Sequence, residues 1–581
     1  MIVNYSDEEV KKGGKSIFLA GPTPRDKDVS SWRPEAIRIL SELGFDGTVY
    51  VPEREFDDRS FDYLKQYWWE REALHNASAI VFWIPRNVKT MPAFTTNAEY
   101  GKYTAINIDK VVYGRPDNSE KIAYFDLDYY VESEENYSNT LTDTLKKAME
   151  IADKRKDMVD LDSYELNIIK RTIEKYPEIM DLVGEVHFSP ENYGNKNASM
   201  TYGRYFFPDA ASDDLKEFDR TILSVLLYHY LIDNRYEKFV EVQGNGDNKL
   251  TRENFDKIRN FMLTNFNTKE KKELLTYYMV INDLGKSKKV IEKLKAKGVE
   301  SVDHDLLLSY LLHFDMLPAL NKFSEESKKA LINVLNNGIN VGQYIQGECV
   351  DYSFNKVLNL NNEEMNLMLA EAILDIGGVR GHFGNLKGSE SLNQSTVNNL
   401  LLATKVLSTC KDQTKIFNEF LGEKANQMHI NSSNPKVRKA VTRICQLLRL
   451  YRQEDVYTVE SEIVNNYYNY SILIDELNKT GYGDTAILPY YAPALLSNAR
   501  SYYENKGSVN PIVEALRTCL PFIERVMVSI REEIGSKEEG IITVMLGDAA
   551  KKVTEDPTLL DNYDIEVLND NEVILKEGRH K

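Results

Sequence analysis

One glutamate stands where a parallel sheet would present it to a ligand. Residues 79–84 form the apolar run Ala-Ile-Val-Phe-Trp-Ile, and Glu99 follows after a short polar segment. The run predicts a buried strand, and the segment around Thr96 and Asn97 predicts a helix with Glu99 in its first turn. Ligands of such sheets bind at the carboxyl ends of the strands. We therefore expect Glu99 to face a ligand, with Thr96 and Asn97 beside it.

The same residues have a second, purely structural interpretation. Thr96 and Glu99 are three positions apart, which is the spacing of a capping box, in which two side chains satisfy the first free amides of a helix. A capping role and a chemical role for Glu99 can coexist.

Composition limits the classes of partner. The chain has 581 residues and a formal net charge of -18, which argues against binding a nucleic-acid backbone. Four cysteines lie far apart, at 349, 410, 445 and 519, and predict buried, reduced thiols. We find no signal region and no membrane-spanning run, so we expect a cytoplasmic protein with no membrane partner.

The first 135 residues alternate between strand and helix patterns. Strands are expected at 16–20, 48–52, 79–85 and 110–114, with helical patterns between them. This alternation predicts an α/β domain over 1–135, with a doubly wound, flavodoxin-like parallel sheet. We expect a helical linker at 136–160 and a mainly α-helical region at 161–581.

Several motifs of the first domain resemble the nucleoside 2-deoxyribosyltransferase-like family. The resemblance covers roughly residues 16–124 and rests on motifs that occur in the family's order. They are Ile17-Phe18-Leu19-Ala20-Gly21-Pro22-Thr23-Pro24-Arg25, Ser31-Trp32-Arg33-Pro34-Glu35-Ala36, Gly44-Phe45-Asp46-Gly47-Thr48-Val49, Trp69-Glu70, Val81-Phe82-Trp83-Ile84-Pro85-Arg86 and Phe94-Thr95-Thr96-Asn97-Ala98-Glu99-Tyr100-Gly101.

The resemblance implies cleavage of the N-glycosidic bond of a nucleoside or nucleotide. Glu99 would attack the anomeric carbon, and a base or water would resolve the glycosyl-enzyme. Departure of the base requires a proton, for which Glu70, Asp57 and Asp58 are candidates. Asp57 and Asp58 also fit a solvated turn, and Glu70 also fits a solvent-facing helix position. This chemistry requires no cofactor.

Other residues of the motifs are candidates for binding substrate. We expect the Gly21-Pro22 turn to let the backbone approach the sugar or base. Trp32, Trp69 and Trp83 could stack on a base, although aromatic residues at such positions are more often core. Arg25, Arg33 and Arg86 suit a phosphate if the substrate is a nucleotide. Relatives often have an acidic residue just before the third strand, where this chain has Ser78. This difference argues against transferase activity more than against hydrolysis or binding.

The rest of the chain shows helical apolar spacing without a fixed repeat. Helices are expected at 215–234, 252–265, 269–282, 305–314, 324–336, 362–374, 396–408, 435–451, 461–477 and 509–534. The segment around Asp283 weakly resembles the HD-type metal phosphohydrolases over a degenerate core near 215–390. This resemblance implies a divalent metal held by His229, Asp283, His304 and Asp305, with Asp375 as a further ligand. Asn282 stands where a metal histidine is expected, so coincidence is the competing interpretation.

Three classes of function remain open. The first is a transferase or hydrolase acting at Glu99 on a nucleoside or nucleotide, with a dinucleotide glycohydrolase acting on NAD as a variant. The second is a metal-dependent nucleotide phosphohydrolase in the helical region. The third is a module that binds a nucleoside without turnover. The family resemblance also implies a homo-oligomer.

Overall fold

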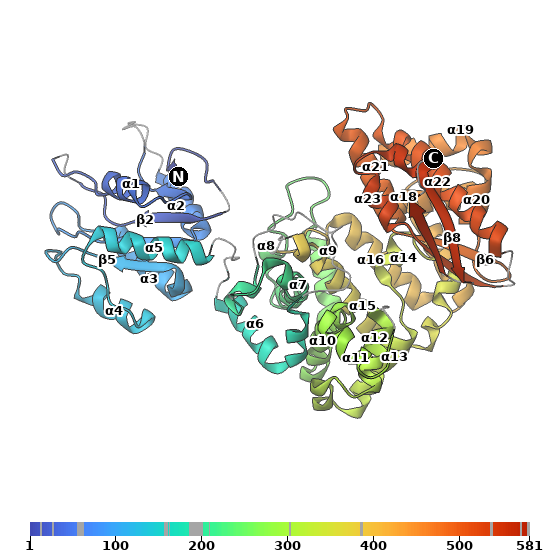
Figure 1. Cartoon of the computed structure of the whole chain (residues 1–581), viewed down its shortest axis with the longest axis horizontal. Helices are drawn as coiled ribbons and strands as arrows, with labels where there is room; N and C mark the ends of the chain where they lie inside the picture. Colours follow the sequence, from blue (N-terminus) through green and yellow to red (C-terminus); the bar gives the residue numbers. More distant parts are fainter. Residues whose placement is uncertain are drawn as a thin grey trace. The chain divides into compact units, whose positions relative to one another are not determined.

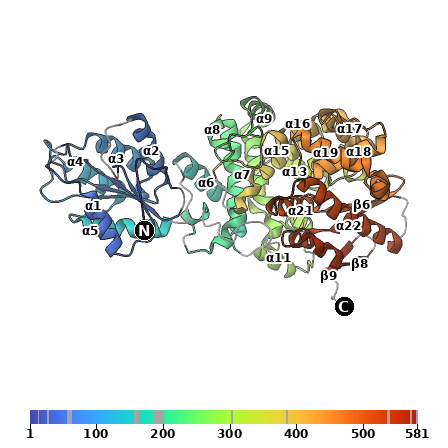
Figure 2. The same ribbon diagram turned by 90° about the horizontal axis from the view of Figure 1, so that it is seen from above.

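The computed structural model describes residues 1–11, 14–25, 28–54, 63–155, 161, 163–184, 201–207, 209–300, 304–383, 387–534, 539–569 and 572–577. Contacts divide the chain into two compact units (Figures 1 and 2). The first unit holds the N-terminal α/β domain, and the second holds most of the helical region.

The N-terminal domain is built on five parallel strands in the order β1-β3-β2-β4-β5. The strands are β1 (Ile2–Tyr5), β2 (Ser16–Ala20), β3 (Thr48–Val51), β4 (Ala79–Trp83) and β5 (Val111–Gly114). The chain runs from β2 outward to β3 and then returns to β4 on the other side of β2. The strand order therefore reverses between β2 and β4, where a doubly wound sheet opens its ligand crevice.

Helices cover both faces of this sheet, which confirms the expected fold class. They are α1 (Arg33–Glu42), α2 (Tyr63–Asn76), α3 (Phe94–Asn107), α4 (Ala123–Ser133) and α5 (Leu141–Arg155). Side chains of α2, α3 and α4 share one apolar core, while those of α1 and α5 share the core on the opposite face. The two sets of helices lie on opposite sides of the sheet in Figure 2.

Two features of this domain were not expected. The edge strand β1 pairs with β3, although its short sequence contains a polar Asn4 and shows no strong strand pattern. Helix α5 falls within 136–160, where we expected a helical linker, but it packs against the sheet through Leu145, Ala148 and Ala152. An amphipathic helix buries its apolar stripe against whatever apolar face is open, and here that face is the sheet.

The region beyond residue 161 is mainly α-helical, as expected. Its helices are α6 (Ser163–Lys175), α7 (Lys216–Ile232), α8 (Tyr236–Phe239), α9 (Arg252–Asn265), α10 (Lys269–Ile281), α11 (Lys288–Lys295), α12 (His304–His313), α13 (Glu325–Asn337), α14 (Val341–Ile345), α15 (Asn362–Gly378), α16 (Gln394–Thr409), α17 (Ile416–Gln427), α18 (Pro435–Leu447), α19 (Gln453–Asn465), α20 (Ser471–Leu477), α21 (Ala492–Asn505), α22 (Pro511–Ile534) and α23 (Gly547–Lys552).

The helical region also contains a second sheet that the sequence did not lead us to expect. Its strands β6 (Thr485–Tyr490), β7 (Gly540–Met545), β8 (Tyr563–Asn569) and β9 (Glu572–Glu577) lie in the order β6-β7-β9-β8. The single helix expected at 461–477 is in fact two, α19 and α20. Asn466 is the residue at which α19 ends, and both its backbone N–H and its side-chain amide donate to the Glu462 carbonyl, at 3.1 and 2.9 Å.

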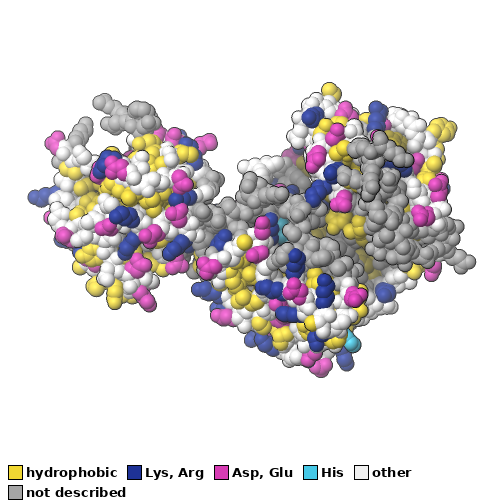
Figure 3. Space-filling view, viewed as in Figure 1, with side chains coloured by type: hydrophobic (Ala, Val, Ile, Leu, Met, Phe, Trp, Pro, Cys, Tyr) yellow, Lys and Arg dark blue, Asp and Glu magenta, His cyan; other side chains and the backbone are white. Residues whose placement is uncertain are grey.

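Two further expectations concern the whole chain. All four cysteines are buried and free, as expected. Among the helices described, none combines the length and apolar character needed to cross a membrane. On the face shown in Figure 3, acidic and basic side chains are interspersed among the coloured residues.

Candidate active site

Glu99 lies in the second turn of α3, at the carboxyl edge of the sheet. The helix begins at Phe94, because Ala93 adopts a left-handed conformation with φ of 60° and turns the chain into it. No side chain caps this start, and Thr96 is buried within the first turn. The expected position of Glu99 in the first turn and the capping box are therefore wrong. Glu99 is half-buried and free of that structural role.

The surroundings of Glu99 oppose its ionisation. Burial is the main cause and the negative charge of Glu70 is the second, and together they raise the pKa of Glu99 to about 8. The positive charges of Arg33 and Lys102 act in the opposite direction. Glu99 therefore belongs to a group of charges contributed by three helices.

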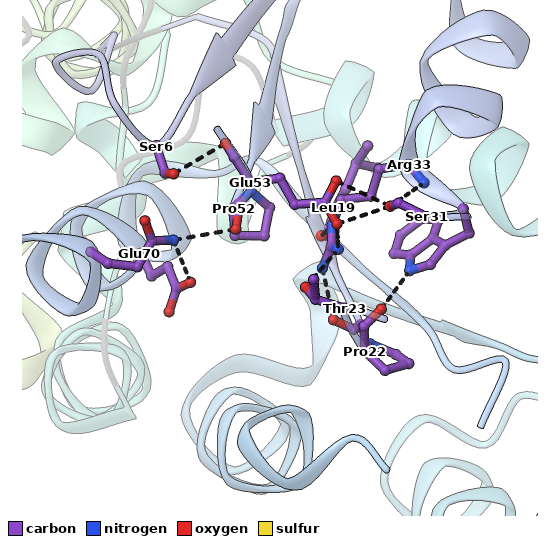
Figure 4. Close-up of polar contacts among 12 residues, drawn as sticks. Ser6, Leu19, Pro22, Thr23, Ser31, Arg33, Pro52, Glu53 and Glu70 are labelled. Atoms are coloured by element: carbon purple, nitrogen blue, oxygen red, sulfur yellow. Dashed lines mark hydrogen bonds and ion pairs between the residues drawn. The ribbon is translucent and has the colours of Figure 1, made fainter. Parts of the chain in front are cut away.

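Glu70 is the second carboxyl group of this site. It projects from α2 and is half-buried, so it does not simply face solvent. The Gln66 amide donates to Glu70 Oε1 at 2.8 Å and to the Pro52 carbonyl at 3.2 Å, which ties Glu70 to the end of β3 (Figure 4). Burial raises the pKa of Glu70, while the Gln66 hydrogen bond and Arg33 counteract this. Two interacting carboxyl groups with raised pKa values are typical of acid–base sites.

Arg33 joins the end of β2 to Glu53, which lies just after β3. Its side chain is 1% exposed and donates from Nε to the Leu19 carbonyl at 3.0 Å and from Nη2 to the Gly21 carbonyl at 2.7 Å. Its Nη1 donates to Thr23 Oγ1 at 3.1 Å and to Glu53 Oε1 at 2.5 Å (Figure 4). These bonds occupy most of its donors, so Arg33 is suited to hold the end of β2 rather than to bind a phosphate.

Glu53 joins three segments at the end of β3. Its carboxylate accepts from Ser31 Oγ at 2.9 and 3.0 Å as well as from Arg33, and its carbonyl accepts from Ser6 Oγ at 3.1 Å (Figure 4). The sequence patterns did not point to Glu53, Ser31, Thr23 or Gln66 as members of the site. A signal for Glu53 was present, since it directly follows the Pro52 that ends an apolar strand.

The turn after β2 is shaped by packing within the protein. Gly21 has φ of 153°, and a Cβ atom there would lie 2.2 Å from the Trp83 carbonyl oxygen. The Trp32 indole donates to the Pro22 carbonyl at 3.3 Å. Trp32 and Trp83 are 8% and 6% exposed and belong to the α1–α5 core. The backbone that approaches Gly21 closely is thus that of β4, and both tryptophans pack as core residues. Trp69 is likewise buried, in the opposite core.

Arg25 and Arg86 lie beside the start of α3. Arg25 is exposed, and its guanidinium lies 5.3 Å from the centre of the Phe94 ring. Arg86 is buried and donates to the Lys121 carbonyl at 3.0 Å and to the Asn97 side-chain oxygen. Asn97 is therefore positioned by Arg86, at the turn of α3 that precedes Glu99.

Two sequence observations have different outcomes. Ser78 lies at the amino ends of the strands, where its hydroxyl accepts from Ser16 N at 3.2 Å. Its departure from an acidic residue thus falls at the edge opposite to Glu99. Asp57 and Asp58 lie outside the described residues.

The metal site expected in the helical region stays a prediction. Asp283 is paired with Lys286 at 2.6 Å, and a bound ammonium group competes with a metal cation for that carboxylate. The His229 ring packs 5.7 Å from the ring of Tyr228, and the side chains of His304 and Asp305 are outside the described set. Within that set, no three His, Cys, Asp or Glu side chains cluster as metal ligands do.

Comparison with known families supports the resemblance noted above. Residues 14–117 match the family described as nucleoside 2-deoxyribosyltransferase like, which defines the α/β unit around Glu99 as a domain of that kind. Residues 186–565, about two thirds of the chain, match a second model. The chain therefore belongs to the family of unknown function DUF6829. No curated protein matches the chain.

Proposed function

We propose that the α/β domain breaks the N-glycosidic bond of a nucleoside or nucleotide, with Glu99 as the nucleophile. The observation that carries this proposal is that Glu99, on the helix that follows β4, interacts electrostatically with a second carboxyl group, Glu70. The match of residues 14–117 suggests glycosyl transfer in general. The particular roles of the two glutamates are our inference.

The pair suits a double displacement. Burial and the charge of Glu70 raise the pKa of Glu99 to about 8, so the pair keeps a proton at neutral pH. For the reaction this proton must move from Glu99 to Glu70, which leaves Glu99 ionised. Glu99 attacks C1′ of the sugar, the C1′–N bond breaks, and Glu70 protonates the departing base.

The second half restores the site. A water molecule or an acceptor base attacks C1′ and gives its proton to the Glu70 carboxylate, while the bond from C1′ to Glu99 breaks. Water as acceptor gives hydrolysis, and a second base gives transfer. The positive charge of Arg33 lowers the pKa of both carboxyl groups and so partly offsets the effect of their burial.

A direct comparison of variants tests this proposal. We would incubate the wild type and Glu99→Gln with nucleosides, nucleotides and NAD, with and without EDTA, and identify products by mass spectrometry. We expect the wild type to release a base regardless of EDTA, and the variant to release none. The matched control is Glu35→Gln, which removes the same charge from an exposed position on α1.

Each alternative class predicts a different result. Release of nicotinamide from NAD alone would assign the site to dinucleotide glycohydrolysis. Phosphate release that EDTA abolishes and that Glu99→Gln retains would favour a phosphohydrolase in the helical region. Binding without any product would favour a sensing module. The homo-oligomer implied by the family stays a prediction.

A further inference from the structure

The segment that leads from β4 to Glu99 is positively charged, although the chain as a whole is acidic. Residues 85–98 contain Arg86 and Lys89 and no aspartate or glutamate, in a chain with net charge -18. Lys89 is exposed in a turn closed by the bond from Met91 N to the Asn87 carbonyl at 2.8 Å. One carboxylate contacts this turn, where Glu120 accepts from Val88 N at 2.7 Å.

The loop after β2 adds a further cation to the same place. Arg25 N donates to the Thr90 carbonyl at 2.9 Å, which ties this loop to the turn after β4. The exposed Arg25 guanidinium lies 5.3 Å from the ring centre of Phe94, the first residue of α3. The two loops therefore bring Arg25 to the start of α3, at the crevice between β2 and β4.

Arg86 brings a buried cation to the same turn. Its side chain is 8% exposed, and it contacts Asn97 in the first turn of α3. Its Nε atom is buried and has no hydrogen-bond partner among the described atoms. The first turn of α3 has no acidic residue and no side-chain cap. The Arg86 guanidinium also lies 5.0 Å from the centre of the Phe125 ring. Arg86 thus brings a buried cation with one unpartnered donor beside a helix start that no side chain caps.

This arrangement of charge points to an anionic ligand. The amino end of a helix carries partial positive charge, so cations placed there repel it and an anion is attracted. Arg33 is less suited to this contact, because most of its donors are engaged by other groups of the protein. Glu99 lies five residues beyond Phe94, about 7.5 Å along the helix axis, a distance comparable to the reach from C1′ of a nucleotide to its 5′-phosphate.

We propose that Arg25, Arg86 and the first turn of α3 bind a phosphate ester on the 5′ carbon of the ribose, so the substrate is a nucleotide rather than a nucleoside. This inference rests on the proposed function, since it places the anomeric carbon at Glu99. The phosphate can belong to a nucleoside monophosphate or to a dinucleotide, and both chemistries present the same group to this cluster.

Binding measurements on the full-length chain test the inference separately from catalysis. In the Glu99→Gln background, which prevents turnover, calorimetry would compare nucleosides, their 5′-monophosphates and NAD. We expect the phosphate-bearing ligands to bind at least about tenfold more tightly than the nucleosides, and this preference to shrink as salt is added. Adding Arg25→Ala should shrink this preference, because it should weaken the binding of the phosphate-bearing ligands more than that of the nucleosides. Arg38→Ala, which removes an exposed cation from α1, is the matched control and should have no effect.

The outcomes divide clearly. Tight binding of monophosphates, or of NAD alone, supports the site if it depends on Arg25, and identifies which molecule supplies the phosphate. Equal affinity for nucleosides and nucleotides, no binding of any phosphate-bearing ligand, or an equal loss in Arg38→Ala overturns it. Phosphate-dependent binding without base release by the wild type would remove the proposed chemistry and leave this inference standing. Base release by the wild type with no preference for phosphate would support the proposed chemistry and overturn this inference.

Discussion

Replacing Glu70 with glutamine should reverse the pH dependence of the reaction. In the wild type the active form of the pair holds one proton, with Glu99 ionised and Glu70 neutral. Loss of that proton leaves the departing base without an acid. Glutamine keeps the shape of Glu70 and can still accept the hydrogen bond from Gln66, but it carries neither charge nor proton.

The structure sets the scale of the effect. The pKa of Glu99 is raised from 4.5 to about 8, first by burial and then by the charge of Glu70. The wild-type rate should therefore fall with a midpoint near pH 8. In Glu70→Gln the burial remains and the opposing charge is gone, so Glu99 should ionise with a midpoint between 4.5 and 8. The rate should then rise with pH and stay high. Its maximum should be roughly a hundredfold or more below that of the wild type, because general acid catalysis is lost.

Base release measured by chromatography from pH 5 to pH 9.5, in buffers of constant ionic strength, gives both profiles. A base that leaves without protonation should restore the first turnover of Glu70→Gln, seen as a burst of released base, because that step then needs no acid. A wild-type rate that keeps rising above pH 8, or a Glu70→Gln variant that keeps the wild-type descending limb, would refute the assignment of Glu70 as the acid.

Three further predictions concern stability. Arg33→Met leaves Glu53 without its cation and should lower the free energy of unfolding by about 3 kcal/mol in denaturant titrations, whereas the exposed Arg38→Met should change it little. Gly21→Ala places a Cβ atom against the Trp83 carbonyl and should cost about 2 kcal/mol or more, so a melting temperature equal to that of the wild type would contradict the packing described. Because the folded state raises the pKa of Glu99, its contribution to stability is present below pH 4.5 and is lost as pH rises to about 8. Glu99→Gln should therefore match the wild type near pH 4.5 and be more stable by a few kcal/mol at pH 9, as thermal unfolding at both pH values would show.

Strong local patterns predicted the framework of the chain. The strand at 16–20 and the helix at 252–265 were placed at their observed bounds, because uninterrupted apolar runs and an amphipathic stripe after a Thr cap are clear local signals. Helix α3 starts earlier than expected. Its start depends on the left-handed conformation of Ala93, which the residue type does not predict. Strand β1 is stabilised by pairing with β3, which is a contact across the fold rather than a local preference.

The sequence predicted the central residue of the site but not the residues that hold the surrounding loops in place. The position of Glu99 after a buried strand was enough to place it at the carboxyl edge of the sheet. Arg33, by contrast, is a loop-flanking cation in sequence, and only the fold shows that its donors point inward to the carbonyls of Leu19 and Gly21. The same holds for Glu53, whose role depends on contacts with Ser31 and Ser6 that lie far from it in the chain.

Detection of a sugar bound covalently to Glu99 would test the proposed chemistry at its key step. The Glu70→Gln variant would be mixed with a nucleotide whose base leaves without protonation, so that the first step proceeds and the second, which needs a base to activate water, is slow. After rapid quenching, mass spectrometry of the intact chain and of its peptides would locate any adduct. The proposed mechanism predicts the mass of one glycosyl group on the peptide that contains Glu99, and no adduct when Glu99 is also replaced by glutamine. Base release without any adduct, or an adduct on another residue, would contradict it.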